Sequence, residues 1–509
     1  EISCSLVGSE MCIRDRYDII IIGSGLGGLE CGAILSKEGY NVCVLEKNEL
    51  FGGCFQTYRR KGHLLDTGIH YIGSLDEGQV MNQFFRYVGI MDHLKVRKLD
   101  ENAFDKIFYK NRVYDYAMGY ERFIDTLCQS FPHEKENLRQ YTTLLKEVGN
   151  LISVDNLKKG IISTEGMKFF NTSAAGMIDK ITTNPDLQSV LAGSALLYGG
   201  LREHSNFYEH AMINNSYIQG AYRFIDGSMQ VASEMINVIR THGGTVLNNS
   251  EVTRIIVENN QAAGVKINRA ERIESKYIIS NVHPKQTLTL LDKTRCIKNA
   301  YISRINSLEN TYGIFTLYLI MKEKSYPYLN QNLYLHGDND VWYDKKVNMG
   351  YTTNCMISTQ ASSRNSDYAD VISILTPMYI DELSAWQNTL PEQRGEDYKT
   401  FKMEKARQLL EFIKSHGIDF TDHIETMYTT TPLSYRDFTG TCDGSAYGII
   451  KDYKCPQIGF VSTRTKLGNL FLTGQNLNVH GALGVTLTSI ITCGELLGHE
   501  YLAKRIGHA

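Results

Sequence analysis

Three glycines near the start of the chain have the spacing of a phosphate-binding turn. Gly23, Gly25 and Gly28 form G-x-G-x-x-G directly after the apolar run at residues 19–22 and before a segment with an apolar helical side. The first glycine permits a tight turn, the second lets a pyrophosphate approach the backbone, and the third lets the helix pack on the strand. A helix that starts there also offers its positive end to the phosphates. The spacing predicts a dinucleotide site.

An acidic residue at the end of the next strand completes this unit. Residues 41–45 form a second apolar run that ends at Glu46 and Lys47. A carboxylate about 20 residues past the glycines accepts hydrogen bonds from an adenosine ribose. A glycine-rich loop without a ligand is the alternative, but strand, glycines, helix, strand and acid in this order favour dinucleotide binding. An acid at this position disfavours a 2′-phosphate and leaves FAD and NAD open.

Length and composition narrow the class of protein. The 509 residues suffice for two or three domains, and 53 Lys and Arg nearly balance 56 Asp and Glu, so the net charge does not point to nucleic acid. The 11 cysteines are scattered without a C-x-x-C pair or a Cys/His cluster, so we expect no metal site and reduced thiols in a cytoplasmic compartment. No apolar run approaches the roughly 18 residues of a membrane span, so we expect a soluble protein or one in peripheral membrane contact.

The rest of the chain alternates between two kinds of pattern. Residues 1–16 lack periodicity and resemble translated vector sequence, so we expect a non-native or disordered leader. Mostly helical patterns fill residues 76–221, whereas residues 251–267 read as a hairpin around Asn259 and Asn260. Further strands are predicted at 311–321, 371–377 and 470–473.

Three separated blocks resemble one known family. Gly52-Gly53 followed by DTGIHYIG (residues 66–73), the E-V-x-x-I segment containing Val252, and the late G-Q-N turn before a small-residue helix stand in the order found in one group of flavoproteins. The chain thus resembles the FAD-dependent family that contains phytoene desaturases, carotenoid isomerases and retinol saturases. The resemblance favours FAD over NAD for the glycine turn.

The resemblance also implies a fold and a set of cofactor contacts. It implies an α/β fold: a Rossmann-type FAD-binding domain of the glutathione-reductase kind with an interleaved α+β substrate domain. The FAD-binding domain would comprise residues 17–75, 222–290 and 440–509, and the substrate domain residues 76–221 and 291–439. The expected cofactor-binding residues are Gly23, Gly25, Gly28, Glu46, Lys47, Gly52, Gly53, Val252, Gly474, Gln475, Asn476 and Gly484. Arg59, Arg60 and Lys61 either face the phosphates or form an ordinary solvated loop.

The family acts on conjugated polyenes, and the resemblance therefore implies redox chemistry at carbon–carbon double bonds of a polyene or isoprenoid lipid. Reduction of the retinol saturase kind is the leading hypothesis. Desaturation, isomerisation, flavin-dependent amine oxidation and a non-catalytic carrier are the alternatives. For reduction, His70, Tyr71 and His480 are the candidate proton donors. No second G-x-G-x-x-G follows a strand, which leaves NAD(P)H, an electron-donor protein and a quinone open as electron sources.

Overall fold

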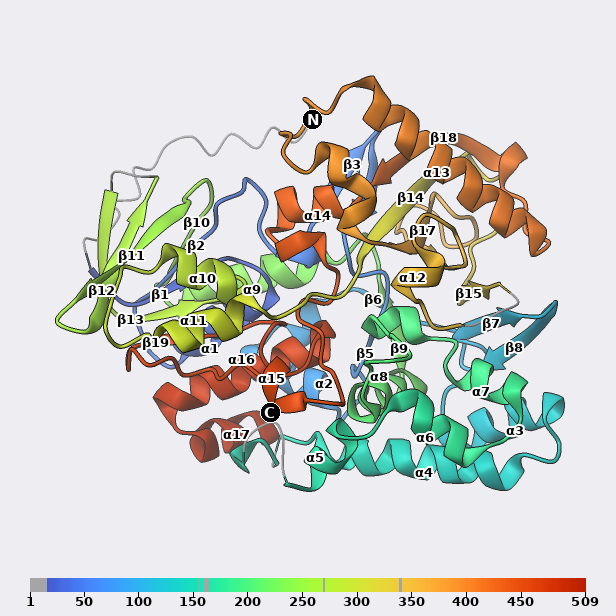
Figure 1. Cartoon of the computed structure of the whole chain (residues 1–509), viewed down its shortest axis with the longest axis horizontal. Helices are drawn as coiled ribbons and strands as arrows, with labels where there is room; N and C mark the ends of the chain where they lie inside the picture. Colours follow the sequence, from blue (N-terminus) through green and yellow to red (C-terminus); the bar gives the residue numbers. More distant parts are fainter. Residues whose placement is uncertain (1–15, 155, 160–163, 269–270, 338–340) are drawn as a thin grey trace.

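A computed structural model describes residues 16–154, 156–159, 164–268, 271–337 and 341–509 (Figure 1). The expected leader therefore lies outside the described residues, apart from Arg16, which begins the first strand. Two large sheets organise the chain. The dinucleotide-binding sheet lies at the left of Figure 1, and the second sheet lies at the upper right above a layer of helices.

The dinucleotide-binding sheet has β1 (Arg16–Ile22) near its centre. Its order is β10-β2-β1-β13-β12-β11, and β19 pairs with the second half of β13. Strands β1, β2, β10, β13 and β19 run parallel, whereas β11 and β12 form the predicted antiparallel hairpin. The bounds of the other strands are β2 (Val42–Leu45), β10 (Thr245–Leu247), β11 (Val252–Glu258), β12 (Gln261–Ile267), β13 (Glu271–Ser280) and β19 (Leu470–Leu472). The apolar run at residues 19–22 is buried, as expected for a parallel strand covered on both faces.

Helices from distant parts of the chain cover this sheet. Helix α1 (Leu26–Lys37) packs against α9 (Met229–Thr241) and α16 (Gly481–Leu497), and α17 (His499–Gly507) packs against α16. Helix α10 (Pro284–Leu290) contacts β11 and the neighbouring α11 (Asn299–Asn306). Because α16 comes from the end of the chain and packs on α1, Gly474 lies close to the first glycine turn.

The second sheet has the order β18-β14-β17-β16-β15-β7-β8 and is antiparallel except where β15 pairs with β7. Its strands are β7 (Asp105–Tyr109), β8 (Arg112–Tyr116), β14 (Gly313–Met321), β15 (Asn332–His336), β16 (Asn354–Thr359), β17 (Val371–Met378) and β18 (Ile424–Thr430). The strands predicted at 311–321 and 371–377 are present as β14 and β17. Strands β7 and β8 fall in the segment expected to be mostly helical. Strand β7 joins the sheet through a long-range pairing with β15, and β8 pairs with β7.

Shorter sheets and helices complete the fold. Two small sheets contain β3 (Thr57–Arg60) with β4 (His63–Asp66), and β5 (Ile72–Gly73) with β9 (Ala221–Phe224) and β6 (Val96–Lys98). The remaining helices are α2 (Val80–Val88), α3 (Tyr120–Ser130), α4 (Lys135–Leu151), α5 (Thr164–Phe170), α6 (Ala174–Ile181), α7 (Pro185–Leu191), α8 (Phe207–Gln219), α12 (Lys345–Asn348), α13 (Gly395–Ser415), α14 (Pro432–Thr439) and α15 (Pro456–Gly459). Within the described part of the chain, none of the helices is both long and apolar enough to span a bilayer.

Candidate functional site

A cavity of about 560 Å³ opens at the carboxyl ends of β1 and β2. This edge of a parallel sheet is where ligands bind in open α/β folds. The expected cofactor-binding residues that line it are Gly23, Gly25, Glu46, Lys47, Gly53, Val252, Gly474, Gln475 and Asn476. Gly28, Gly52 and Gly484 do not line it, although they belong to the turns and helix that form its wall.

The glycines of the first turn are required by close backbone packing. A Cβ atom at Gly28 would lie 2.0 Å from the carbonyl oxygen of Gly23, so α1 could not pack on the turn with a side chain there. Gly52 forms a bridge to Gly25, and its amide donates to the carbonyl of Ser24 over 3.1 Å. Gly484 packs closely on the backbone of Val479, because a Cβ atom added at Gly484 would lie 2.7 Å from the carbonyl carbon of Val479.

Glu46 both shapes the turn and faces the cavity. Its Oε2 accepts hydrogen bonds from the backbone amide and the hydroxyl of Ser24, over 2.9 and 2.7 Å, and its Oε1 accepts from the amide of Asn48 over 2.9 Å. A carboxylate offers about four lone-pair sites, so acceptor capacity remains for a ligand hydroxyl.

Asn281 was not among the predicted site residues. Its side chain lies between the two glycine turns. A Cβ atom added to Gly25, Gly27 or Gly474 would lie only 2.9, 2.8 or 2.6 Å, respectively, from an atom of the Asn281 amide group. The only signal in the sequence is its place directly after the apolar run that ends at Ser280. Tyr435, Arg436 and Tyr447 also line the cavity and come from a region without a recognisable motif.

The cavity contains charges of both signs. Lys47, Lys285 and Arg436 are the basic residues of its lining, and Glu46, Glu251 and Asp443 the acidic ones. Arg59, Arg60 and Lys61 line neither this cavity nor the one beside it. They form the exposed end of the β3–β4 hairpin, where Lys61 pairs with Glu425 at 3.7 Å, which favours the alternative of an ordinary solvated loop.

A second, smaller cavity of about 90 Å³ joins the first. Both are lined by Gly68, Ile69, Ile314, Leu375, Tyr447, Gly481 and Ala482. Beyond this junction the lining is largely apolar and aromatic, with Met81, Leu196, Leu197, Ile213, Tyr217, Met356 and Leu483 beside His70 and Tyr71. None of the described residues that line it is acidic.

His70 and Tyr71 differ sharply in their contacts. His70 is 9% exposed, and neither ring nitrogen has a hydrogen-bond partner in the described structure. Burial, with the positive charge of Arg223, lowers the pKa of its imidazole to about 4, so the ring is neutral at pH 7. The hydroxyl of Tyr71 donates to Asp105 over 3.0 Å and lies 2.5 Å from that of Tyr334, and burial raises its pKa well above 10.

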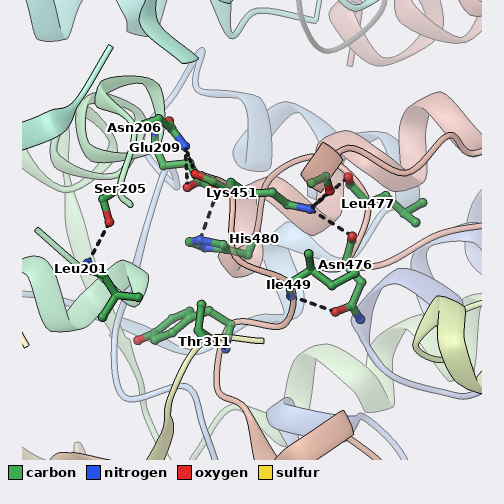
Figure 2. A network of polar contacts seen from close by, with 12 residues as sticks. Leu201, Ser205, Asn206, Glu209, Thr311, Ile449, Lys451, Asn476, Leu477 and His480 are labelled. Carbon is green, nitrogen blue, oxygen red and sulfur yellow. Dashed lines mark hydrogen bonds and ion pairs between the residues drawn. The ribbon is translucent and has the colours of Figure 1, made fainter. Parts of the chain in front are cut away.

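His480 lies outside both cavity linings, directly before Gly481 at the start of α16. Its Nε2 is 3.2 Å from Oε1 of Glu209 in α8, and both side chains are almost fully buried (Figure 2). Asn206 holds the other oxygen of Glu209 over 3.0 Å and also donates to the carbonyl of Lys451. The ring centroid of His480 is 5.4 Å from that of Tyr447, which lines both cavities. His480 therefore supports the cavity wall from behind.

Comparison with known proteins agrees with this architecture. Residues 21–88 match the model of the NAD(P)-binding Rossmann-like domain. The chain is 25% identical to the all-trans-retinol 13,14-reductase of Danio rerio over 95% of this chain and 86% of that protein. It is also 25% identical to prolycopene isomerase 2 of an Oncidium hybrid, over 52% of this chain and 48% of that protein. A 4,4'-diapophytoene desaturase of Methylomonas is 22% identical over 96% and 97% of the two chains.

Solved structures show the same fold at lower identity. An oxidoreductase from Methanosarcina mazei superimposes with a TM-score of 0.62 at 17% identity, over 93% of this chain and 99% of that one. Cyclohexylamine oxidase from Brevibacterium oxydans gives a TM-score of 0.61 at 14% identity, over 96% and 99%.

The dinucleotide-binding sheet, the glycine turn with Glu46 and the joined cavities define a Rossmann-type oxidoreductase with an interleaved second domain. Within this class, the chain is similar over most of its length to the all-trans-retinol 13,14-reductases and to a diapophytoene desaturase, and over about half of it to a prolycopene isomerase.

Proposed function

We propose that the protein binds FAD in the larger cavity and acts on a carbon–carbon double bond of an apolar polyene or isoprenoid lipid held at the smaller one. In the direction of reduction, the flavin would give a hydride to one carbon of the double bond, and a proton would go to the neighbouring carbon. The observation that supports this most is the junction of the two cavities at Ile69, Ile314 and Ala482. A redox ring placed there would face a largely apolar chamber. Reduction, as in the retinol 13,14-reductases, is the leading direction.

The larger cavity fits FAD in its chemistry. Backbone can approach a pyrophosphate closely at Gly25, and the first turn of α1 contains no acidic residue that would repel it. Glu46 would accept the ribose hydroxyls, and the backbone at Val252 would meet the adenine end. The first turn of α16 also lacks acidic residues, and its unpaired N–H groups would face negative charge on the flavin ring.

The smaller cavity would hold the reacting part of the substrate. Its 90 Å³ is below the roughly 300–1,000 Å³ of typical small-molecule pockets, so it would hold only the reacting segment of a polyene, and the rest of the chain would lie outside it. Bound FAD would supply the hydride chemistry. The residues at the junction would orient the chain over the ring and exclude water.

The structure bears on the three candidate proton donors. His70 lines the cavity but is neutral at pH 7, and the hydroxyl of Tyr71 is engaged with Asp105 and Tyr334. His480 lines neither cavity. We therefore propose that Tyr71 and His480 position other groups, and that His70 contacts the substrate without acting as a cationic acid. Unchanged turnover in His70→Ala and Tyr71→Phe would remove the donor hypothesis.

The alternatives differ in how the site supports them. Desaturation and isomerisation use the same cavities and are distinguished only by turnover. Amine oxidation is supported by the likeness of fold to cyclohexylamine oxidase, but the smaller cavity offers a substrate ammonium no carboxylate among its described residues. The proposal leaves NAD(P)H, an electron-donor protein and a quinone as possible electron sources. It places the enzyme in the cytoplasm, in peripheral contact with a membrane that supplies the apolar substrate.

An anaerobic optical experiment tests the proposal. The purified protein should show a flavin band that bleaches on chemical reduction. With all-trans-retinol added, the band should return while the polyene absorbance moves to shorter wavelength. Reduced flavin that ignores retinol would overturn the substrate assignment, and well-folded protein that binds no FAD would overturn the cofactor assignment. NADPH added in place of the chemical reductant tests direct reduction by nicotinamide.

A further inference from the structure

Asn281 lines the larger cavity with a side-chain amide that the protein itself does not use. The residue directly follows β13, and its backbone amide donates to the carbonyl of Ile22 over 2.9 Å. Among the described residues, none is a hydrogen-bond partner of its side-chain amide, which is partly exposed. The side chain of Asn476, which lines the same cavity, differs because its Oδ1 accepts from the amide of Ile449 over 3.3 Å. The amide of Asn281 therefore keeps its hydrogen-bonding capacity for a ligand.

Three glycines define the place of this amide group. The nearest atom to a Cβ added at Gly25 is Nδ2 of Asn281, whereas Oδ1 is the nearest atom to a Cβ added at Gly27 or Gly474. Gly25 has a φ of −59°, which any residue can adopt, so the backbone conformation does not require a glycine there. Asn281 instead leaves no room for a side chain at Gly25. Its donor end is thus placed beside the second glycine of the turn, and its acceptor end beside the late turn.

The chemistry at Gly25 identifies the ligand group that this donor fits. The second glycine of such a turn is where a pyrophosphate approaches the backbone. A phosphate oxygen only accepts hydrogen bonds, and the Nδ2 group of asparagine offers two N–H donors. A hydrogen bond to a charged acceptor is about twice as strong as one between neutral groups. Glu46, the acidic residue of the same unit, cannot make this contact because its carboxylate has no proton to donate.

We propose that Asn281 is a cofactor-binding residue that donates a hydrogen bond from Nδ2 to the pyrophosphate of FAD beside Gly25. The inference rests on the proposed function and deepens it, because it adds a side chain from the end of β13 to the glycine turn and Glu46. Since the other end of the amide packs against Gly474, the same side chain would hold the late turn at a fixed distance from the phosphates.

Titration of the deflavinated protein with FAD tests this with a change that keeps the shape of the side chain. Asn281→Ala should bind FAD at least about tenfold more weakly, as the loss of one charge-assisted hydrogen bond allows. Asn281→Asp should bind still more weakly at pH 8, because a carboxylate repels the phosphates and cannot donate. Its affinity should rise as the pH is lowered toward 5, since a protonated carboxyl group is neutral and donates.

Asn259→Asp is the matched control, because it makes the same change at the exposed turn of the β11–β12 hairpin. It should bind FAD like wild type at each pH.

Thermal unfolding of the FAD-free variants separates a ligand contact from a structural role. Because the amide of Asn281 has no partner in the protein to lose, Asn281→Ala and Asn281→Asp should melt close to the wild-type temperature. Wild-type FAD affinity in Asn281→Asp, an affinity that does not change with pH, or a large drop in both melting temperatures would overturn the inference and leave the proposed function intact. Well-folded wild-type protein that binds no FAD would overturn the proposed function itself.

Discussion

The carboxylate of Glu46 is bound twice by Ser24, through its amide over 2.9 Å and its hydroxyl over 2.7 Å. This contact ties the end of β2 to the glycine turn that follows β1. The acid expected to recognise a ribose therefore also holds the shape of the turn expected to hold the pyrophosphate. Loss of either contact should affect cofactor binding at both places.

Glu46→Gln should weaken FAD binding at least tenfold, because an amide replaces one of two oxygens that accept hydrogen bonds from the turn and the ribose. Ser24→Ala should have a smaller effect, of about 1 kcal/mol, since it removes one neutral donor and leaves the backbone contact. Titration of the deflavinated variants with FAD measures both effects. The exposed neighbour Glu49→Gln is the control and should bind like wild type. Wild-type affinity in Glu46→Gln would contradict the assignment of Glu46.

Gly28→Ala should prevent stable folding of the dinucleotide-binding domain. The new methyl group would lie 2.0 Å from the carbonyl oxygen of Gly23, which belongs to the turn and cannot move without displacing it. Gly468→Ala is the matched control, because a Cβ there meets nothing within 4 Å. Soluble yield, bound FAD and melting temperature are the measurements. If both variants gave the same soluble yield, FAD content and melting temperature, the turn would accommodate a methyl group at residue 28, and the prediction would be contradicted.

The local parts of the site were predictable from sequence, and the long-range parts were not. The glycine turn and Glu46 belong to one short strand–helix–strand unit, so their spacing in sequence fixes their spacing in space. Asn281 fits between Gly25 and Gly474, a relationship that exists only after three distant segments come together. His480 was identified from its place before the late glycines, but its partner Glu209 comes from another helix.

Local sequence left the place of the basic loop open and gave the wrong elements for residues 105–116, because tertiary contacts decide both. The basic residues Arg59, Arg60 and Lys61 follow the glycines closely in sequence, yet the hairpin of β3 and β4 carries them away from the cavity. Strands β7 and β8 were missed inside a helical region. Strand β7 pairs with β15, more than 200 residues later in the chain, and β8 joins the sheet only through β7.

Glu30→Gln should change how stability depends on pH. Glu30 is fully buried between α1 and α16, its Oε1 accepts from Thr486 over 2.6 Å, and burial raises its pKa to about 8. Between its ordinary pKa of 4.5 and about 8 the folded state binds more protons than the unfolded state, so wild-type stability falls as pH rises through this window. Glutamine does not ionise, so the stability of Glu30→Gln does not fall for this reason in the same pH window. It should match wild type near pH 5 and exceed it by about 3–4 kcal/mol at pH 8.

Melting temperatures measured from pH 5 to pH 8.5 check this expectation. The difference between Glu30→Gln and wild type should grow steadily with pH. A constant difference would mean that Glu30 is ionised in the folded state throughout, with a charge that the protein stabilises by other means.

The buried pair of His480 and Glu209 should be structural, with an effect on the flavin through α16. The two side chains face one another (Figure 2) and are 3% and 4% exposed. Removal of one partner therefore leaves a buried polar group uncompensated. We expect His480→Ala or Glu209→Ala to cost about 3–5 kcal/mol of folding free energy. The double variant should cost less than the sum, because neither group is then left alone.

The pair formed by His204 and Asp452 is a suitable control for these variants. Its atoms are 2.8 Å apart, but the two side chains are 39% and 29% exposed, so His204→Ala should cost no more than about 1 kcal/mol. Because His480 precedes Gly481 and Ala482, which line both cavities, its loss should also shift the flavin absorption band and lower FAD occupancy. The pH profile of turnover should keep its shape in surviving enzyme. A stable, flavin-loaded His480→Ala with an altered pH profile would instead make His480 a proton donor, and the ring would then have to reach the cavity by moving away from Glu209.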